Sequence, residues 1–122
     1  MAIYVKTSNP KEIISKIKHG IEKGKIDTWK CDSNDYFRHT QNLWDEIIKG
    51  NDMFFKPIYS NGKLIFGLTC NKKQQLPRKP YGIYHGRFIE MLINHCSDFI
   101  DEISVSIKNV KYIDDYEIDE SL

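Results

Sequence analysis

The chain has 122 residues, 40% of them hydrophobic and 29% charged, and its formal net charge is +1. This length suits one domain, and the composition is that of a globular chain rather than a disordered one. No apolar run approaches the ~18 residues of a membrane helix, and residues 1–11 show no signal-peptide pattern, so we expect a cytoplasmic protein with no membrane partner.

Charge is unevenly distributed along the chain. The last ten residues, 113–122, contain five acidic residues and no Lys or Arg, whereas residues 1–112 hold 18 basic and 12 acidic residues and a net charge of +6. We therefore expect a single domain at 1–112 and an acidic C-terminal tail at 113–122. Two interpretations stay open: a solvated chain end, or a basic body that meets an anionic partner and is shielded by its tail.

The N-terminal segment predicts a strand followed by a helix. Residues 2–7 are rich in strand-forming side chains. Three features then mark a helix. Asn9 and Glu12 can form a capping box, Ile14, Ile17 and Ile21 make an apolar stripe, and Gly24 suits the end of the helix. Gly20 lies inside this helix, where it costs about 1 kcal/mol relative to Ala, so we expect close packing there.

A hairpin and a short helix follow. Residues 26–31 and 35–40 read as strands, and the turn-forming residues 32–34 between them predict a hairpin. Thr40 can cap a short helix that ends at Gly50.

The sequence Asn61-Gly62 gives the strongest structural signal. Both residues suit the positive φ angles of a two-residue hairpin turn. The turn sets a register in which Ser60 pairs with Lys63, and it places most apolar side chains of 53–60 and 63–70 on one face. Pro57 lacks an amide hydrogen, which favours an edge strand or a site without that hydrogen bond.

The C-terminal half predicts a polar loop at 71–79, a long helix from Pro80 to about Asp101 and a strand at 103–107. The order is then β-α-β-β-short α-β-β-α-β. This order predicts an α+β domain, a two-layer sandwich whose mainly antiparallel sheet carries two long helices on one face.

Motifs for metals and cofactors are absent from the sequence. It contains no Cys-x-x-Cys, no His pair with ligand spacing, no phosphate-binding loop and no Gly-x-Gly-x-x-Gly, so we expect neither a metal nor a cofactor. The three separated cysteines, Cys31, Cys70 and Cys96, also argue against a disulfide framework.

Three groups of residues are candidates for contact with a partner. The first is the hairpin group of aromatic and basic side chains, Trp29, Tyr36, Arg38 and His39. The second is the basic loop before the long helix, Lys72, Lys73, Arg78 and Lys79, where helix amides favour anions. The third group is His85 and Arg87 on the long helix. Each group also has a purely structural explanation: ordinary cross-strand pairing for the hairpin group, a solvated loop for the basic loop, and an Arg87–Glu90 ion pair for the helix group.

Gly82 and Gly86 also fall on this helix, four residues apart, and we expect them to allow tight packing against the sheet.

Three functions fit these patterns. The first is a small non-catalytic protein-binding module, an inhibitor or immunity-type protein of bacterial character that masks the functional surface of a toxin or enzyme. The second is a nucleic-acid-binding protein that uses the basic 72–79 loop and the 27–39 hairpin. The third is a small hydrolase or nuclease that uses His85 and Arg87 with His39 or Asp35, provided that these groups converge in one cleft. The missing catalytic motifs favour the first.

Overall fold

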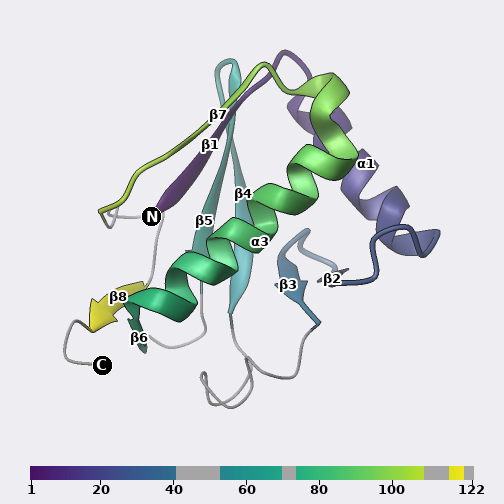
Figure 1. Ribbon diagram of the computed structural model, residues 1–122. Coiled ribbons are helices and arrows are strands. Elements are labelled where there is room, and N and C mark those ends of the chain that lie inside the picture. The colour runs from purple at the N-terminus through teal and green to yellow at the C-terminus, as the bar shows by residue number, and fades with distance from the viewer. Residues whose placement is uncertain (41–52, 70–73, 109–115, 120–122) are drawn as a thin grey trace.

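A computed structural model shows an α+β fold that contains a six-stranded antiparallel sheet and two helices (Figure 1). It describes residues 1–40, 53–69, 74–108 and 116–119. The strand order in the sheet is β2-β3-β4-β5-β1-β7. The elements in chain order are β1 (Ala2–Lys6), α1 (Pro10–Glu22), β2 (Trp29–Cys31), β3 (Phe37–His39), β4 (Phe54–Ser60), β5 (Lys63–Thr69), β6 (Gln74–Pro77), α3 (Arg78–Cys96), the 3-10 helix η1 (Ser97–Phe99), β7 (Glu102–Val105) and β8 (Tyr116–Asp119).

The β4–β5 hairpin has the predicted register. Ser60 pairs with Lys63, and the pairing continues to Phe54 with Thr69. Gly62 has a φ of 68°, as predicted, but Asn61 does not adopt the predicted positive φ, because Asp35 is the single non-glycine residue with a positive φ in the described part of the chain. Pro57 is accommodated because β3 pairs with β4 only at Phe55, so its missing amide hydrogen falls outside the β3–β4 ladder.

The start of α1 differs from the predicted capping box. The Asn9 side chain makes no capping hydrogen bond, and the Asn9 amide donates to the Thr7 hydroxyl at 3.0 Å instead of to Glu12. The buried stripe of the helix follows the prediction in part, because Ile21 is only partly buried and Ile13 is buried although it was not in the predicted stripe. Ile14 and Ile17 are buried, and a Cβ on Gly20 would lie 2.7 Å from Ile26 Cδ1, so the glycine does permit close packing.

The β2–β3 hairpin forms as predicted, but both strands are shorter than the sequence indicates. The Asp32 carboxylate accepts the amides of Asn34 (2.8 Å) and Tyr36 (3.0 Å), and Asp35 has a φ of 63°. These hydrogen bonds hold residues 32–36 in the turn and so delay the start of β3. The short helix predicted after Thr40 lies outside the described residues.

The sequence predicts a polar loop at 71–79, and this prediction is wrong at residues 74–77. Residues 74–77 of the expected loop form β6, which pairs in parallel with β8 from residues 116–119 of the tail. Helix α3 begins at Arg78 and ends at Cys96, where η1 replaces its expected last turn. Long-range pairing between segments about forty residues apart leaves no local pattern in the sequence.

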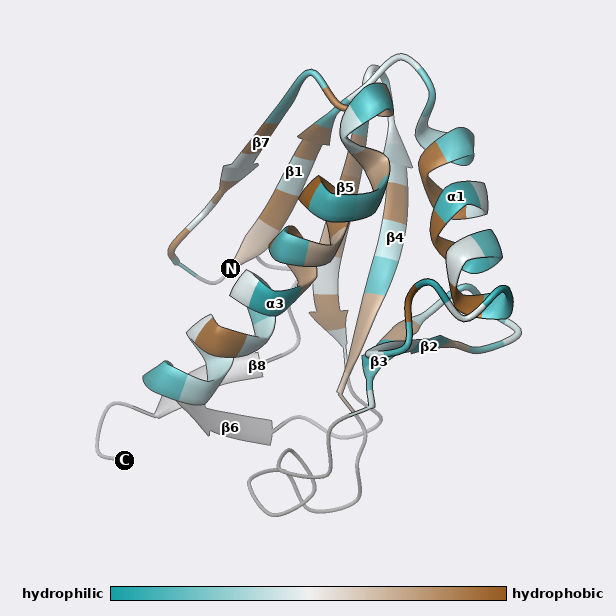
Figure 2. Cartoon of the chain, turned by 45° about the vertical axis from the view of Figure 1, so that its right-hand side comes forward, coloured by the Kyte–Doolittle hydropathy of each residue, from teal (hydrophilic) through white to brown (hydrophobic). Residues whose placement is uncertain are grey.

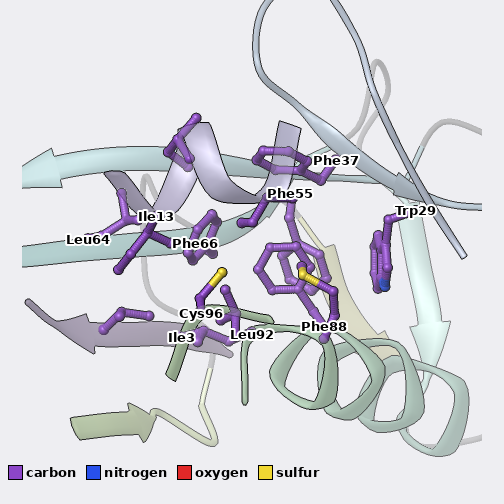
Figure 3. Packing of buried hydrophobic residues seen from close by; sticks show 14 of the residues in the cluster. Ile3, Ile13, Trp29, Phe37, Phe55, Leu64, Phe66, Phe88, Leu92 and Cys96 are labelled. Atoms are coloured by element: carbon purple, nitrogen blue, oxygen red, sulfur yellow. The ribbon is translucent and has the colours of Figure 1, made fainter. Parts of the chain in front are cut away.

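Aromatic rings dominate the core between the sheet and the helices (Figure 3). Phe88 of α3 is fully buried, and its ring centroid lies 4.4 Å from that of Phe55, 4.7 Å from that of Phe66 and 5.0 Å from that of Trp29. Buried isoleucines of α1 join the same cluster, and Figure 2 shows the apolar side of α1 turned toward the strands. The core thus ties both helices to the sheet.

Gly82 and Gly86 do not pack tightly against the sheet, contrary to the prediction. A Cβ atom at either position would meet no other described residue within 4 Å outside the helix itself. The buried stripe of α3 runs instead through Tyr81, Tyr84 and Phe88, which lie on the other side of the helix.

Candidate interaction surface

Strand alternation gives the six-stranded sheet two faces. Side chains such as Ile3, Phe55 and Leu64 point into the core with the buried residues of α1 and α3, so both helices lie against this inner face. The intervening side chains of the strands point the other way, and we call that side the outer face. In Figures 1 and 2, both helices lie on the same side of the strands.

An apolar row crosses the middle of the outer face. Tyr4 of β1 lies opposite Ile65 of β5, and Ile65 lies opposite Ile58 of β4. All three side chains are partly exposed. Apolar side chains that meet on three adjacent strands form a patch whose burial by a partner is favourable.

Lysines flank the apolar row on both sides. Lys6 and Lys63 lie opposite each other two residues beyond the row, and Lys56 lies two residues before it. All three lysines are exposed. Glu102 of β7 pairs with Lys6 from the other neighbouring strand, and it is the single acidic side chain among the described strand residues of this face.

A second pair of like charges lies at the opposite end of the sheet, where Lys30 of β2 faces Arg38 of β3. Like charges directly opposite on neighbouring strands are destabilising. The outer face has two such pairs, counting Lys6 with Lys63. Anionic groups of a partner would remove this repulsion, and local rules are most often broken at functional sites.

The outer face is hollowed near the Asn61-Gly62 turn. A shallow pocket of about 550 Å³ opens there between β7, β1 and the turn. It is lined by Tyr4, Lys6, Asn61, Gly62, Lys63, Glu102 and Ser104. Such a hollow, with two ammonium groups beside a tyrosine, can hold an acidic loop or side chain of a partner.

Among the predicted contact residues, Arg38 lies on the outer face and Tyr36 lies in the turn just before β3. Both are partly exposed, and the Nε atom of Arg38 is buried without a hydrogen-bond partner among the described residues. Arg78 and Lys79 form the exposed start of α3, whereas Lys72 and Lys73 lie outside the described residues.

Trp29 and His85 are core residues. Only 2% of Trp29 and 1% of His85 is exposed, although both were predicted as candidate contact residues. The Nδ1 atom of His85 lies 2.7 Å from the Tyr81 carbonyl oxygen, and its ring packs edge-on against Phe55 with the centroids 5.0 Å apart. Neither side chain is available for contact with a protein partner on the outer face of the sheet.

The groups named for hydrolysis converge only in part. His39 and Arg87 line one pocket between α3 and the β2–β3 hairpin. His85 lies in the core, and the Asp35 carboxylate accepts a hydrogen bond from Lys18 at 2.8 Å. The Arg87–Glu90 ion pair that we predicted is present at 3.4 Å.

Two cysteines of the described chain are poor nucleophiles. Burial raises the pKa of Cys31 to about 11, with a further contribution from the Asp35 charge, and burial likewise raises the pKa of Cys96 to about 11. Both thiols are free and stay protonated at neutral pH.

The apolar row and its lysines were not among the predicted site residues. The hairpin register did place Ile58 and Ile65 on the face opposite the core. That Tyr4 and Lys6 lie on the same face could be seen only from the position of β1 beside β5, because strand order leaves no local signal in the sequence. In the sequence, the available signal for this surface is that Lys6, Lys56 and Lys63 lie on predicted strands.

Among the residues that the structure describes, no group of three or more His, Cys, Asp or Glu side chains is placed to hold a metal ion. Neither α1 nor α3 is both long and apolar enough to cross a membrane. The chain matches no protein-family model, no curated protein and no solved structure.

Proposed function

We propose that the chain is a non-catalytic protein-binding module, an inhibitor or immunity-type protein that uses its outer face to cover an acidic surface of another protein. The observation that carries this proposal is the apolar row of Tyr4, Ile58 and Ile65, which is flanked by Lys6 and Lys63 on one side and by Lys56 on the other. Protein interfaces commonly combine an apolar centre with a polar rim, and tyrosine is a frequent energetic anchor.

The two helices support this surface from behind. In this proposal they form one layer and the sheet forms the second, so the outer face is a rigid platform with the helices on its far side. The positive rim accelerates encounter with an acidic partner and disfavours basic ones. Carboxylates of the partner would also relieve the repulsion within the Lys6–Lys63 and Lys30–Arg38 pairs.

A nucleic-acid partner is less well supported by the same surface. Sheets that bind single strands stack successive bases on several aromatic rings. The apolar row offers one ring, that of Tyr4, and two isoleucines, which cannot stack on a base. Phe54 lies on the same face but at the far end of β4.

Site-specific photocrosslinking in cells of the source organism tests the proposal. A photoreactive phenylalanine at position 4 should form a discrete adduct with one protein, because Tyr4 lies at the centre of the surface. The same probe at Ile83, which is 41% exposed on α3, is the matched control and should not form that adduct. An adduct that disappears on nuclease treatment, or equal adducts from both positions, would contradict the proposal.

A further inference from the structure

A second pocket lies away from the outer face, between α3 and the β2–β3 hairpin. Its volume is about 270 Å³, which is just below the range of about 300–1,000 Å³ typical of small-molecule sites. The residues that line it are Thr28, Trp29, His39, Arg87, Glu90, Met91, Asn94 and His95. Five of these come from one side of α3, at positions spaced by one, three or four residues.

The innermost side chains of the pocket are buried, although most of its lining is polar. Trp29 is 2%, Met91 4% and His39 7% exposed. The His39 ring meets the Trp29 ring edge-on, with the centroids 4.9 Å apart and the planes at 88°. Burial is the main cause that lowers the pKa of His39. The positive charge of Arg87 lowers this pKa further, whereas the negative charge of Glu90 raises it, and the net result is a neutral ring at pH 7.

The rim of the pocket carries two opposite charges. Arg87 Nη1 and Glu90 Oε2 are 3.4 Å apart, and both side chains are more than half exposed. An exposed pair at this distance is worth little to stability. Both groups therefore remain able to exchange this contact for stronger hydrogen bonds with a ligand, five N–H donors on the guanidinium and two oxygens on the carboxylate.

We propose that this pocket binds a small zwitterion of the α-amino acid class. The Arg87 guanidinium would take the ligand carboxylate in a bidentate pair, and the Glu90 carboxylate would take its ammonium group. The ligand side chain would then point toward Trp29 and Met91. A ligand with a carboxylate alone would meet the negative charge of Glu90, and one with an ammonium alone would meet the positive charge of Arg87.

Three matched ligands separate these cases. The full chain is titrated with each of the common amino acids, and binding is followed by the nuclear magnetic resonance shifts of the Trp29 indole. Each amino acid that binds is then compared with its N-acetyl derivative and with its carboxamide. We expect at least one amino acid to bind with a Kd of about 1 mM or tighter, and both derivatives to bind at least tenfold more weakly. Inorganic phosphate is included to detect a simple anion site.

Substitutions at the exposed rim then test the assignment without affecting the core. Arg87→Gln and Glu90→Gln should each weaken binding at least tenfold, whereas Lys23→Gln, at the end of α1, should leave the Kd unchanged. If none of the common amino acids shows saturable binding at concentrations up to about 10 mM, the proposal is overturned. Equal binding of the N-acetyl derivative, or tighter binding of phosphate, would also overturn it.

Discussion

Lys6 of β1 and Lys63 of β5 lie directly opposite each other on the outer face of the sheet. Cross-strand neighbours of like charge repel, and Glu102 offsets this only on the β7 side of Lys6. A sequence selected for stability alone would not favour this pairing. It fits a surface whose charges are neutralised by a partner.

Lys63→Gln should therefore stabilise the free protein slightly. Removing one charge of the pair relieves the repulsion, and we expect the free energy of unfolding to rise by about 0.5 kcal/mol or less. Urea denaturation at low ionic strength measures this change, and added salt should reduce it. A lower midpoint for Lys63→Gln than for the unchanged chain would show that the two lysines do not repel each other.

The Asn61-Gly62 turn depends on its glycine. A Cβ on Gly62 would touch none of the residues that the structure describes within 4 Å, so we assign the cost of Gly62→Ala to the positive φ of 68°, about 1 kcal/mol. Gly82→Ala is the matched control, because Gly82 lies in α3 and is equally free of contacts. This second change should stabilise the protein by up to about 1 kcal/mol. Thermal unfolding of both variants in parallel should show shifts of opposite sign.

Phe88 joins helix α3 to the aromatic core of the protein. It is fully buried among Phe55, Phe66 and Trp29. Phe88→Ala should cost about 3–5 kcal/mol, a large part of the ~5–15 kcal/mol that stabilises a typical domain. Ile93→Ala, at a position 54% exposed on the same helix, should change stability by about 0.5 kcal/mol or less. A similar effect of both substitutions in chemical denaturation would refute this account of the core.

His39 should make the protein less stable as the pH falls. Its pKa in the folded chain is below the ordinary value of 6.5, mainly because of burial. The unfolded chain thus binds the proton more readily, and stability is lost as the pH drops from about 6.5 toward the folded pKa. Replacing His39 with Gln should remove this part of the pH dependence.

Neighbouring charges give a second check on His39. Glu90→Gln should lower the pKa of His39 further, and Arg87→Gln should raise it, since these charges act in opposite directions on the imidazolium. Titration of the His39 ring signals by nuclear magnetic resonance measures both shifts. Two shifts of the same sign would show that the ring does not sense this ion pair.

Local sequence patterns predicted the parts of the fold that local chemistry determines. The β4–β5 register followed from the Asn61-Gly62 turn, and the buried stripe of α1 followed from its isoleucine spacing. The pairing of β6 with β8 and the position of β1 between β5 and β7 depend on contacts between distant segments. No spacing rule encodes such contacts, and the outer face is assembled by them.

The candidate site was predictable only in fragments for the same reason. Arg38 was predicted as a candidate contact residue from its place beside aromatics, but its cross-strand neighbour Lys30 was not. Trp29 and His85 were selected by residue type, yet both serve the core. A residue type shows what a side chain can do, whereas its burial depends on the helix that covers it.

The central claim is that the outer face binds a protein partner. It is tested most directly by measuring how tightly two charge-reversed variants bind the protein that was captured through position 4. Lys63→Glu changes the rim of the outer face, and Lys23→Glu makes the same change at the exposed end of α1. Titration calorimetry against the purified partner should show at least a tenfold weaker Kd for Lys63→Glu, about 1.4 kcal/mol, and no change for Lys23→Glu. Equal affinities of the two variants would contradict the assignment of the outer face as the binding surface.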